Sequence, residues 1–241
     1  MHYSRLLLNV QSSQVRKDLA SDHEMHRTVM SAFADLRLAE ESNLRQRQNA
    51  DSGSILWRVD RDRRRGIVML LVQSELSPDW QPLRDRYPSY VTTPSDSDLP
   101  PISMMDRTLS FSPGKVFQFR LRANPTRKER TEGRKNGRRL GLVTPEEQRA
   151  WLKRKAADES SGFQLGRFDV VPNPDSQRHG GTANVIGEDQ GATITRQLTH
   201  VAAIFEGTLS VTVPELFQQT LRSGIGSAKA FGFGLLSIAR V

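Results

Sequence analysis

The chain has 241 residues, 36% of them hydrophobic and 26% charged, which is the composition of a folded protein with one large or two small domains. Its 35 lysines and arginines against 27 acidic residues give a net charge of +8 and an isoelectric point near 10.3, which favours a polyanionic partner such as nucleic acid. Because the chain has no cysteine, disulfides, thiolate metal sites and a cysteine nucleophile are excluded. The longest apolar run, residues 67–72, is too short to cross a bilayer and no signal peptide is visible, so we expect a cytoplasmic protein without a membrane partner.

The first part of the chain combines strand and helix patterns. Ser21 and Glu24 have the spacing of a capping box, and apolar residues recur at helical spacing after them, which predicts a helix to about residue 38. Three short apolar runs predict strands at residues 3–10, 55–59 and 67–73. A charged turn at 60–66 joins the last two of these strands.

A stretch rich in proline and serine, residues 88–114, predicts a linker. We place the linker at 96–113, between a first domain of residues 1–95 and a second domain of residues 114–241.

The second part repeats the mixture of strands and helices. Thr144, Pro145 and Glu147 predict the start of a helix that ends near residue 157, and Pro214 opens a short helix through 221. The Gly-, Pro- and Asn-rich residues 172–191 predict a mobile loop. Four segments carry strand patterns: residues 115–122, 163–171, 194–213 and 235–241.

These elements predict an α+β fold. Two tandem ferredoxin-like (RRM-like) domains with antiparallel sheets are the simplest account, and one larger mixed domain is the alternative.

The glycine-rich segment 224–234 reads GIGSAKAFGFG, with Lys229 in its middle. Glycines let a backbone approach a phosphate chain closely, so the pattern favours a loop that binds phosphates. The alternative is a helix C-cap followed by a tight turn. Neither a Walker loop nor a dinucleotide fingerprint is present. The candidate phosphate-binding residues are Gly224, Gly226, Lys229, Gly232 and Gly234.

Two histidines, His23 and His26, fall at the start of the predicted helix, followed by Arg27. The positive end of the helix dipole disfavours a protonated imidazole, which suits His26 as a general base, and it offers a site for an anion such as a phosphate. The alternative is a pair of solvated surface histidines. A metal site is not indicated, because H-E-M-H is not the H-E-x-x-H pattern and no third ligand is near.

A strongly basic run lies between residues 127 and 139. It predicts a hairpin or arm that contacts an RNA backbone, and the alternative is a solvated charged loop. Since the aromatic residues are scattered, a folded RNA stem is a better ligand than an extended strand. The cations of this basic run are Arg127, Lys128, Arg130, Arg134, Lys135, Arg138 and Arg139.

Taken together, these motifs resemble the CasE family, the crRNA-processing endoribonucleases of type I-E CRISPR systems. The resemblance runs nearly end to end. It is carried by six blocks: SRLLLN at 4–9, EMHR at 24–27, FRLRANP at 119–125, AWLKRK at 150–155, FEGTLSV at 205–211 and GIGSAKAFGFGLLSIA at 224–239.

The resemblance implies two ferredoxin-like domains that bind the hairpin of each CRISPR repeat and cut once at the 3′ base of its stem. The cut needs no metal or other cofactor: the 2′-hydroxyl attacks the adjacent phosphate and leaves a 2′,3′-cyclic phosphate and a 5′-hydroxyl. The family's catalytic histidine falls on His26, and a nearby tyrosine falls on His23, which raises a two-histidine mechanism. Such proteins keep the cleaved RNA and join the other subunits of Cascade.

Two other classes of function compete with this prediction. A non-catalytic scaffold that binds an RNA hairpin needs the basic run and the glycine-rich segment, but not a histidine at a helix start. A small-molecule enzyme with a phosphate-binding loop lacks a nucleotide fingerprint.

Overall fold

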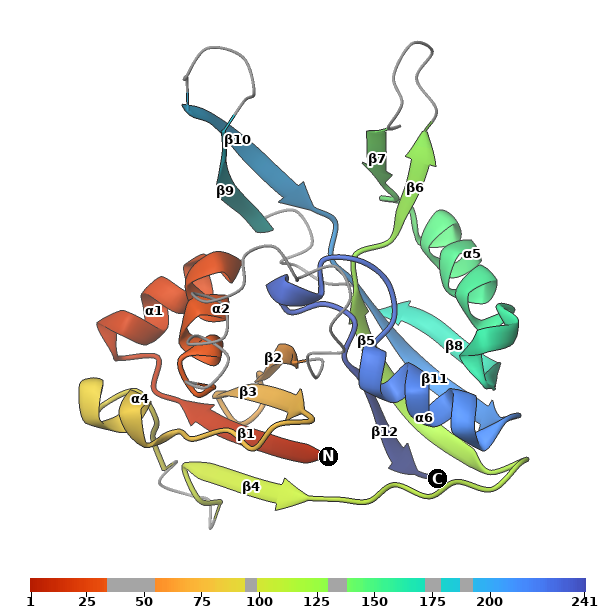
Figure 1. The fold of residues 1–241 in the computed structure, drawn as a ribbon, viewed down its shortest axis with the longest axis horizontal. Coiled ribbons are helices and arrows are strands. Elements are labelled where there is room, and N and C mark those ends of the chain that lie inside the picture. Colours follow the sequence, from red (N-terminus) through yellow and green to blue (C-terminus); the bar gives the residue numbers. More distant parts are fainter. Residues whose placement is uncertain (34–54, 94–98, 130–137, 172–178, 187–192) are drawn as a thin grey trace.

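Two four-stranded antiparallel sheets, each covered by helices, lie side by side in the computed structural model of the chain (Figure 1). The structure describes residues 1–33, 55–93, 99–129, 138–171, 179–186 and 193–241. The first sheet has the strand order β2-β3-β1-β4 and the second has the order β12-β5-β11-β8. Numbered along the chain within each sheet, the strands of both sheets follow the order 4-1-3-2.

The described residues of the N-terminal unit form four strands and three helices. Its elements are β1 (His2–Leu8), α1 (Ser13–Ala20), α2 (Asp22–Met30), β2 (Leu56–Asp62), β3 (Ile67–Ser74), α4 (Gln81–Arg86) and β4 (Ile102–Asp106). The three strands predicted from this part of the sequence are confirmed as β1, β2 and β3.

Helix α2 begins where the sequence predicted, because the Ser21 side chain accepts a hydrogen bond from the Glu24 N–H. The helix is shorter than predicted and ends at Met30. Ala32 and Phe33 follow it in a turn and are buried, so their apolar character serves the core outside the helix.

Strand β4 corrects the predicted linker. It lies within residues 96–113 but pairs with β1, with Leu6 opposite Ile102 and His2 opposite Asp106. The first sheet therefore extends to Asp106. This edge strand has no clear strand pattern, because three of its five residues are exposed and prolines precede it.

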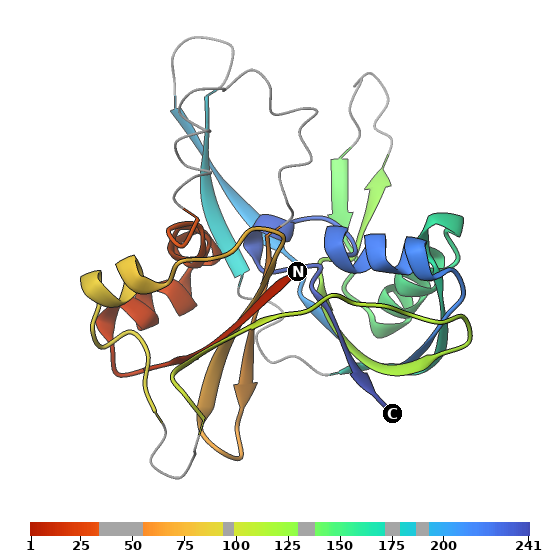
Figure 2. The same cartoon turned by 60° about the horizontal axis from the view of Figure 1, so that its bottom comes forward.

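The C-terminal unit adds two projecting ribbons to a second sheet. Its elements are β5 (Val116–Ala123), β6 (Thr126–Glu129), β7 (Arg138–Gly141), α5 (Pro145–Ala156), η1 (Glu159–Ser161), β8 (Phe163–Val171), β9 (His179–Ile186), β10 (Thr193–His200), β11 (Ala203–Val211), α6 (Pro214–Ser223), η2 (Lys229–Phe231) and β12 (Leu236–Arg240). The pairs β6–β7 and β9–β10 both extend away from the sheets on the same side of the molecule (Figure 2).

Several predictions for the C-terminal unit are confirmed and two are corrected. The capping box at Thr144 and Glu147 is present, and Pro145 opens α5. The predicted loop 172–191 is wrong in part, because 179–186 forms β9 and pairs with β10. The single strand pattern at 194–213 is divided into β10 and β11, since the chain leaves one ribbon and enters the sheet at 201–202.

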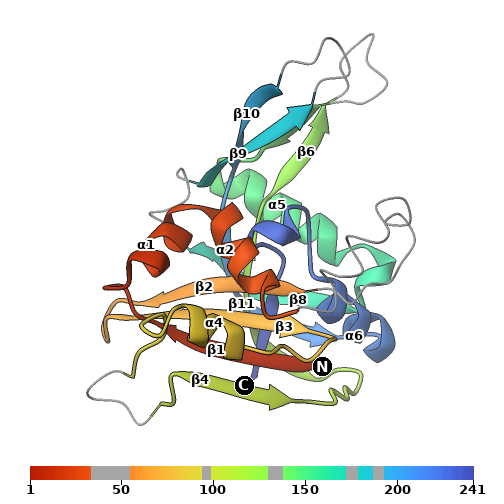
Figure 3. The ribbon, with the colours of Figure 1, turned by 60° about the vertical axis from the view of Figure 1, so that its left-hand side comes forward.

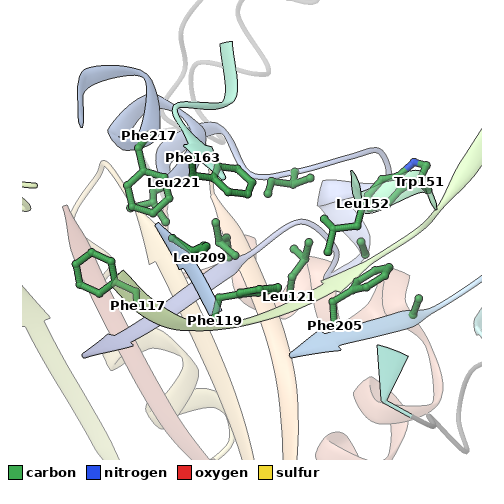
Figure 4. Close-up of a cluster of buried hydrophobic side chains, with 14 of the residues drawn as sticks. Phe117, Phe119, Leu121, Trp151, Leu152, Phe163, Phe205, Leu209, Phe217 and Leu221 are labelled. Carbon is green, nitrogen blue, oxygen red and sulfur yellow. The ribbon is translucent and has the colours of Figure 1, made fainter. Parts of the chain in front are cut away.

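Each unit has its own buried core. In the C-terminal unit, aromatic and aliphatic side chains of the sheet pack beneath α5 and α6 (Figure 4). Trp151 stacks on Phe205 with ring centroids 6.0 Å apart, and Phe163 packs against Phe217. The N-terminal core lies between the first sheet and its helices and includes Met25 and Val29 of α2. Burial of one face of α2 fixes which of its residues face outward.

A buried arginine joins the two units. Arg58 of β2 is only 2% exposed, and its Nη1 donates to the carbonyls of Arg120 and Leu235 at 3.1 and 3.2 Å. Its Nε and Nη2 donate to the two carboxylate oxygens of Asp60, each at 2.9 Å. Arg58 thus ties the edge of the first sheet to β5 and to the segment before β12.

Candidate functional site

His26 lies where the N-terminal unit meets the glycine-rich segment of the C-terminal unit. It is the fifth residue of α2, just beyond the first turn, and its side chain is half-buried. Its ring centroid is 6.5 Å from that of Phe231 in η2. His23, one turn earlier, is exposed, and Arg27 is exposed and paired with Glu24 at 3.2 Å.

A buried carboxylate fixes the position of α2. Asp18 of α1 is 1% exposed and accepts hydrogen bonds from Thr28 Oγ1 at 2.8 Å and from the Tyr90 hydroxyl at 2.7 Å. Burial, together with the negative charge of Asp18, raises the pKa of Tyr90 far above its usual value, so the phenol remains a donor. Because Thr28 belongs to α2, this network holds the helix that carries His26.

His200, at the end of β10, is a site residue that the sequence did not indicate. Its ring lies 5.0 Å from Phe231 and 5.7 Å from Phe233, centroid to centroid, so Phe231 contacts both His26 and His200. The two histidines are 174 residues apart in the sequence, which explains why no spacing pattern could connect them.

The hydrogen bonds around His200 define its tautomer. Asn124 Oδ1 accepts from the Val201 N–H at 3.2 Å, so the Asn124 Nδ2 faces His200 Nδ1, 3.3 Å away, as a donor. His200 Nδ1 is therefore an acceptor and the proton is on Nε2. Burial lowers the pKa of His200. The charge of Asp22 opposes this effect and that of Arg122 adds to it. His200 is thus a neutral imidazole near neutral pH.

All four glycines of the glycine-rich segment have a positive φ: Gly224, Gly226, Gly232 and Gly234. Gly224 is the C-cap of α6, as the structural alternative expected. A Cβ on Gly232 would lie 2.6 Å from a ring carbon of Trp57, whose Nε1 donates to the Ala230 carbonyl. Backbone conformation and packing account for these glycines, and phosphate contact through them stays a prediction.

Lys229 gives this segment a positive charge. It lies in η2 together with Phe231, the residue whose ring is near His26. It is half-buried, and burial, followed by the charge of Lys155 on α5, lowers its pKa. Two cations from different elements therefore lie close enough to affect each other, an arrangement that an anion would stabilise.

The described ends of the basic run, 127–129 and 138–139, lie in β6 and β7, which pair as the antiparallel strands that a hairpin predicts. Arg127, Lys128 and Arg139 are exposed, and Lys128 is the direct cross-strand partner of Arg139. Like charges placed opposite each other destabilise a ribbon unless an anion lies between them. Arg130, Arg134 and Lys135 lie outside the described residues, and for Arg138 only the backbone is described.

Two features that the described residues lack bear on other functions. No group of three or more His, Asp or Glu side chains is placed to hold a metal ion. No described helix is long and apolar enough to span a bilayer.

Comparison with known proteins identifies the family. Residues 1–240 match the family model described as CRISPR associated protein. The CRISPR-associated endoribonuclease Cse3 of Thermus thermophilus is 35% identical over 240 residues, which are 99% of this chain and 100% of that protein. The chain belongs to the Cse3/Cas6e family of type I-E CRISPR-associated endoribonucleases.

Two solved structures show how far the likeness extends. Thermus thermophilus Cse3 bound to an RNA representing a pre-cleavage complex has a TM-score of 0.70 at 32% identity, covering 99% of this chain and 98% of that one. The CRISPR-associated protein Cas6e from Escherichia coli K-12 shares the fold, with a TM-score of 0.59 at 19% identity over the full length of both chains. The α+β fold with two antiparallel sheets is therefore that of the Cse3/Cas6e family.

The packing of this Cse3/Cas6e chain predicts different costs for two glycine substitutions. Gly66→Ala places a Cβ in open space at positive φ and should cost roughly 1–2 kcal/mol of stability. Gly232→Ala adds a clash with Trp57 and should cost roughly 2–5 kcal/mol. Urea unfolding of both variants measures the difference, and equal losses would show that the segment moves away from Trp57 without cost.

The depressed pKa of His200 predicts a pH-dependent stability. The unfolded chain protonates this histidine near pH 6.5 but the folded chain does so only at lower pH, so its contribution is present above about 6.5 and is lost as pH falls. The melting temperature of His200→Gln should fall less than that of the wild type between pH 7.5 and 5. Between pH 7.5 and 9 the two should change in parallel. An equal fall on acidification would show that His200 titrates alike in both states.

Proposed function

We propose that this protein is a metal-independent endoribonuclease that cleaves CRISPR precursor RNA at the 3′ base of each repeat hairpin and so yields mature crRNA. The observation that carries the proposal is His26, half-buried between the two units beside the cationic glycine-rich segment, in a chain 35% identical to an endoribonuclease.

The proposed reaction is an internal transesterification. The ribose 2′-oxygen forms a bond to the adjacent phosphorus as its proton leaves, and the bond to the 5′-oxygen of the next nucleotide breaks as that oxygen gains a proton. The products are a 2′,3′-cyclic phosphate and a 5′-hydroxyl. His26 moves a proton in this scheme, and Lys229 offsets the negative charge that develops on the phosphate. His23, exposed one turn away, has at most a secondary part.

We propose that the hairpin stem lies against β6–β7 and the glycine-rich segment. The facing cations Lys128 and Arg139 and the partly buried Lys229 support a polyanionic ligand on this side of His26. Arg27, exposed beside His26, is a further candidate for phosphate contact.

We also propose that the two units are tandem ferredoxin-like domains. The shared 4-1-3-2 strand order and the β-α-β-β-α-β sequence of main elements support this assignment. Because β4 belongs to the first sheet, the boundary falls after Asp106 and before β5. As a member of a type I-E family, the protein is proposed to keep its cleaved RNA and to join the other subunits of Cascade.

His26→Ala should reduce the single-turnover cleavage of a CRISPR repeat hairpin by ~10²–10⁴-fold, because an acid–base group is lost, while the affinity for the hairpin is kept. The assay is run in EDTA. His23→Ala should lose less activity. A wild-type protein that binds the hairpin but never cuts it would favour the non-catalytic scaffold instead.

Hairpin binding should weaken steeply with salt. If about five cations meet phosphates, the slope of log K against log salt should be ~−3.5 to −4.5. The double variant Lys128→Gln/Arg139→Gln should flatten that slope by roughly 1.4–1.8. Arg63→Gln/Arg64→Gln removes two exposed cations in the β2–β3 turn, far from the ribbons (Figure 2), and should leave it unchanged. If both double variants flatten the salt slope equally, the ribbon acts only through the net charge of the protein.

A further inference from the structure

A cleft of about 620 Å³ lies beside His26 and is lined by residues of α1, α2 and α4 and of the segments that follow α2 and α4. Figure 3 shows the arrangement of these three helices. Its lining residues all come from the N-terminal unit, whereas Phe231, the other neighbour of His26, comes from the C-terminal unit. In Figures 1 and 3, α1 and η2 lie on opposite sides of α2. His26 therefore stands at the border between the glycine-rich segment and this cleft, which has a volume typical of small-ligand sites.

The charge of the cleft favours an anion. Lys17, Arg27 and Arg86 line it against one carboxylate, Glu24, an excess of two positive charges. Glu24 binds Lys17 at 3.0 Å and Arg27 at 3.2 Å, and the hydrogen bond from Lys17 is the main reason that its pKa is lowered. Glu24 thus holds two of the cations in place. Arg86 makes no ion pair with any residue that the structure describes.

A flat platform lies in the same cleft. The guanidinium of Arg86 is 5.3 Å from the centroid of the Tyr87 ring, and Tyr87 packs against the buried Tyr90 with centroids 6.4 Å apart. Unpaired bases stack on aromatic rings and on the planes of arginine side chains with little dependence on base identity. Cations for the phosphate and a platform for the base together are the chemistry of a nucleotide site.

We propose that this cleft, the downstream cleft, holds the first unpaired nucleotide on the 3′ side of the cut, the one whose 5′-oxygen is the leaving group. The inference rests on the proposed function: a stem held by β6–β7 and Lys229 brings its 3′ base to His26 from the C-terminal unit. The strand that continues past His26 then enters the cleft. The base stacks on Arg86 and Tyr87, while Lys17 and Arg27 contact its phosphates, which aligns the leaving oxygen with the attacking 2′-oxygen.

The test measures how much one downstream nucleotide adds to affinity. A repeat hairpin that the wild-type protein cuts is made with a 2′-deoxy nucleotide at the cut position, in three forms: ending at the cut, with one downstream nucleotide, and with that nucleotide abasic. The downstream nucleotide should tighten wild-type binding roughly 5- to 30-fold, and the abasic form should lose most of this gain. Arg86→Gln and Tyr87→Leu should remove the gain while binding the shortest hairpin normally.

Arg84→Gln is the matched control, because Arg84 is an exposed cation on the same helix that does not line the cleft. It should leave the gain intact. If Arg84→Gln acts like Arg86→Gln, or if the abasic form keeps the full gain, the cleft is not a nucleotide site. If the wild type cuts the hairpin but gains nothing from the downstream nucleotide, the cleft proposal fails while the proposed function stands. If no hairpin is bound at all, the proposed function fails first.

Discussion

The buried guanidinium of Arg58 is the constraint on which the site depends. Four hydrogen bonds hold the guanidinium in one position. Two go to Asp60 on the same strand, and two go to main-chain carbonyls of the other unit, at Arg120 and Leu235. Loss of the Asp60 carboxylate would leave the buried Arg58 guanidinium without this counter-ion, which typically costs ~3–5 kcal/mol. Because main-chain carbonyls cannot be moved without moving their strands, Arg58 sets the position of β5 and of the start of β12 relative to β2. The indole N–H of the neighbouring Trp57 donates a hydrogen bond to the Ala230 carbonyl, and Gly232 packs against the Trp57 ring.

This constraint makes the site a composite of two units that fold around separate cores. His26 is placed by α2, which Asp18 anchors to the N-terminal core, whereas Phe231 and His200 are placed by the C-terminal unit. A substitution between the two units, for example at Arg58, therefore alters the distance from His26 to Phe231 and His200 without changing these residues themselves. The same arrangement gives His26 two different surroundings, with the cationic glycine-rich segment on one side and the downstream cleft on the other. The proposed cleavage, which separates a held stem from a departing strand, would use both.

The parts of the fold that local sequence determines were predictable, and the parts that depend on distant pairing were not. Ser21 and Thr144 cap helices through contacts three residues away, so their patterns located α2 and α5 correctly. Strand β4 exists because β1 offers it an edge, and β9 exists because β10 pairs with it, so neither carries a strong pattern of its own. For the same reason His26 was recognisable from its helix start. His200, which joins the site only through Phe231 and Asn124, was not.

Backbone conformation and packing explain the glycines of the glycine-rich segment, and phosphate contact through them stays a prediction. Its glycines were predicted as a phosphate cradle, yet each has a positive φ, and Gly232 also meets the face of Trp57. Between the glycines lie the half-buried Lys229 and Phe231, and the Phe231 ring centroid is 6.5 Å from that of His26. The segment turns at its glycines and also at Ala228, whose φ is 63°, and these turns present Phe231 toward His26 of α2. The glycine pattern is therefore associated with the candidate site because the turns at the glycines position the residues between them. Arg58 and Trp57 hold this loop through hydrogen bonds to the carbonyls of Leu235 and Ala230.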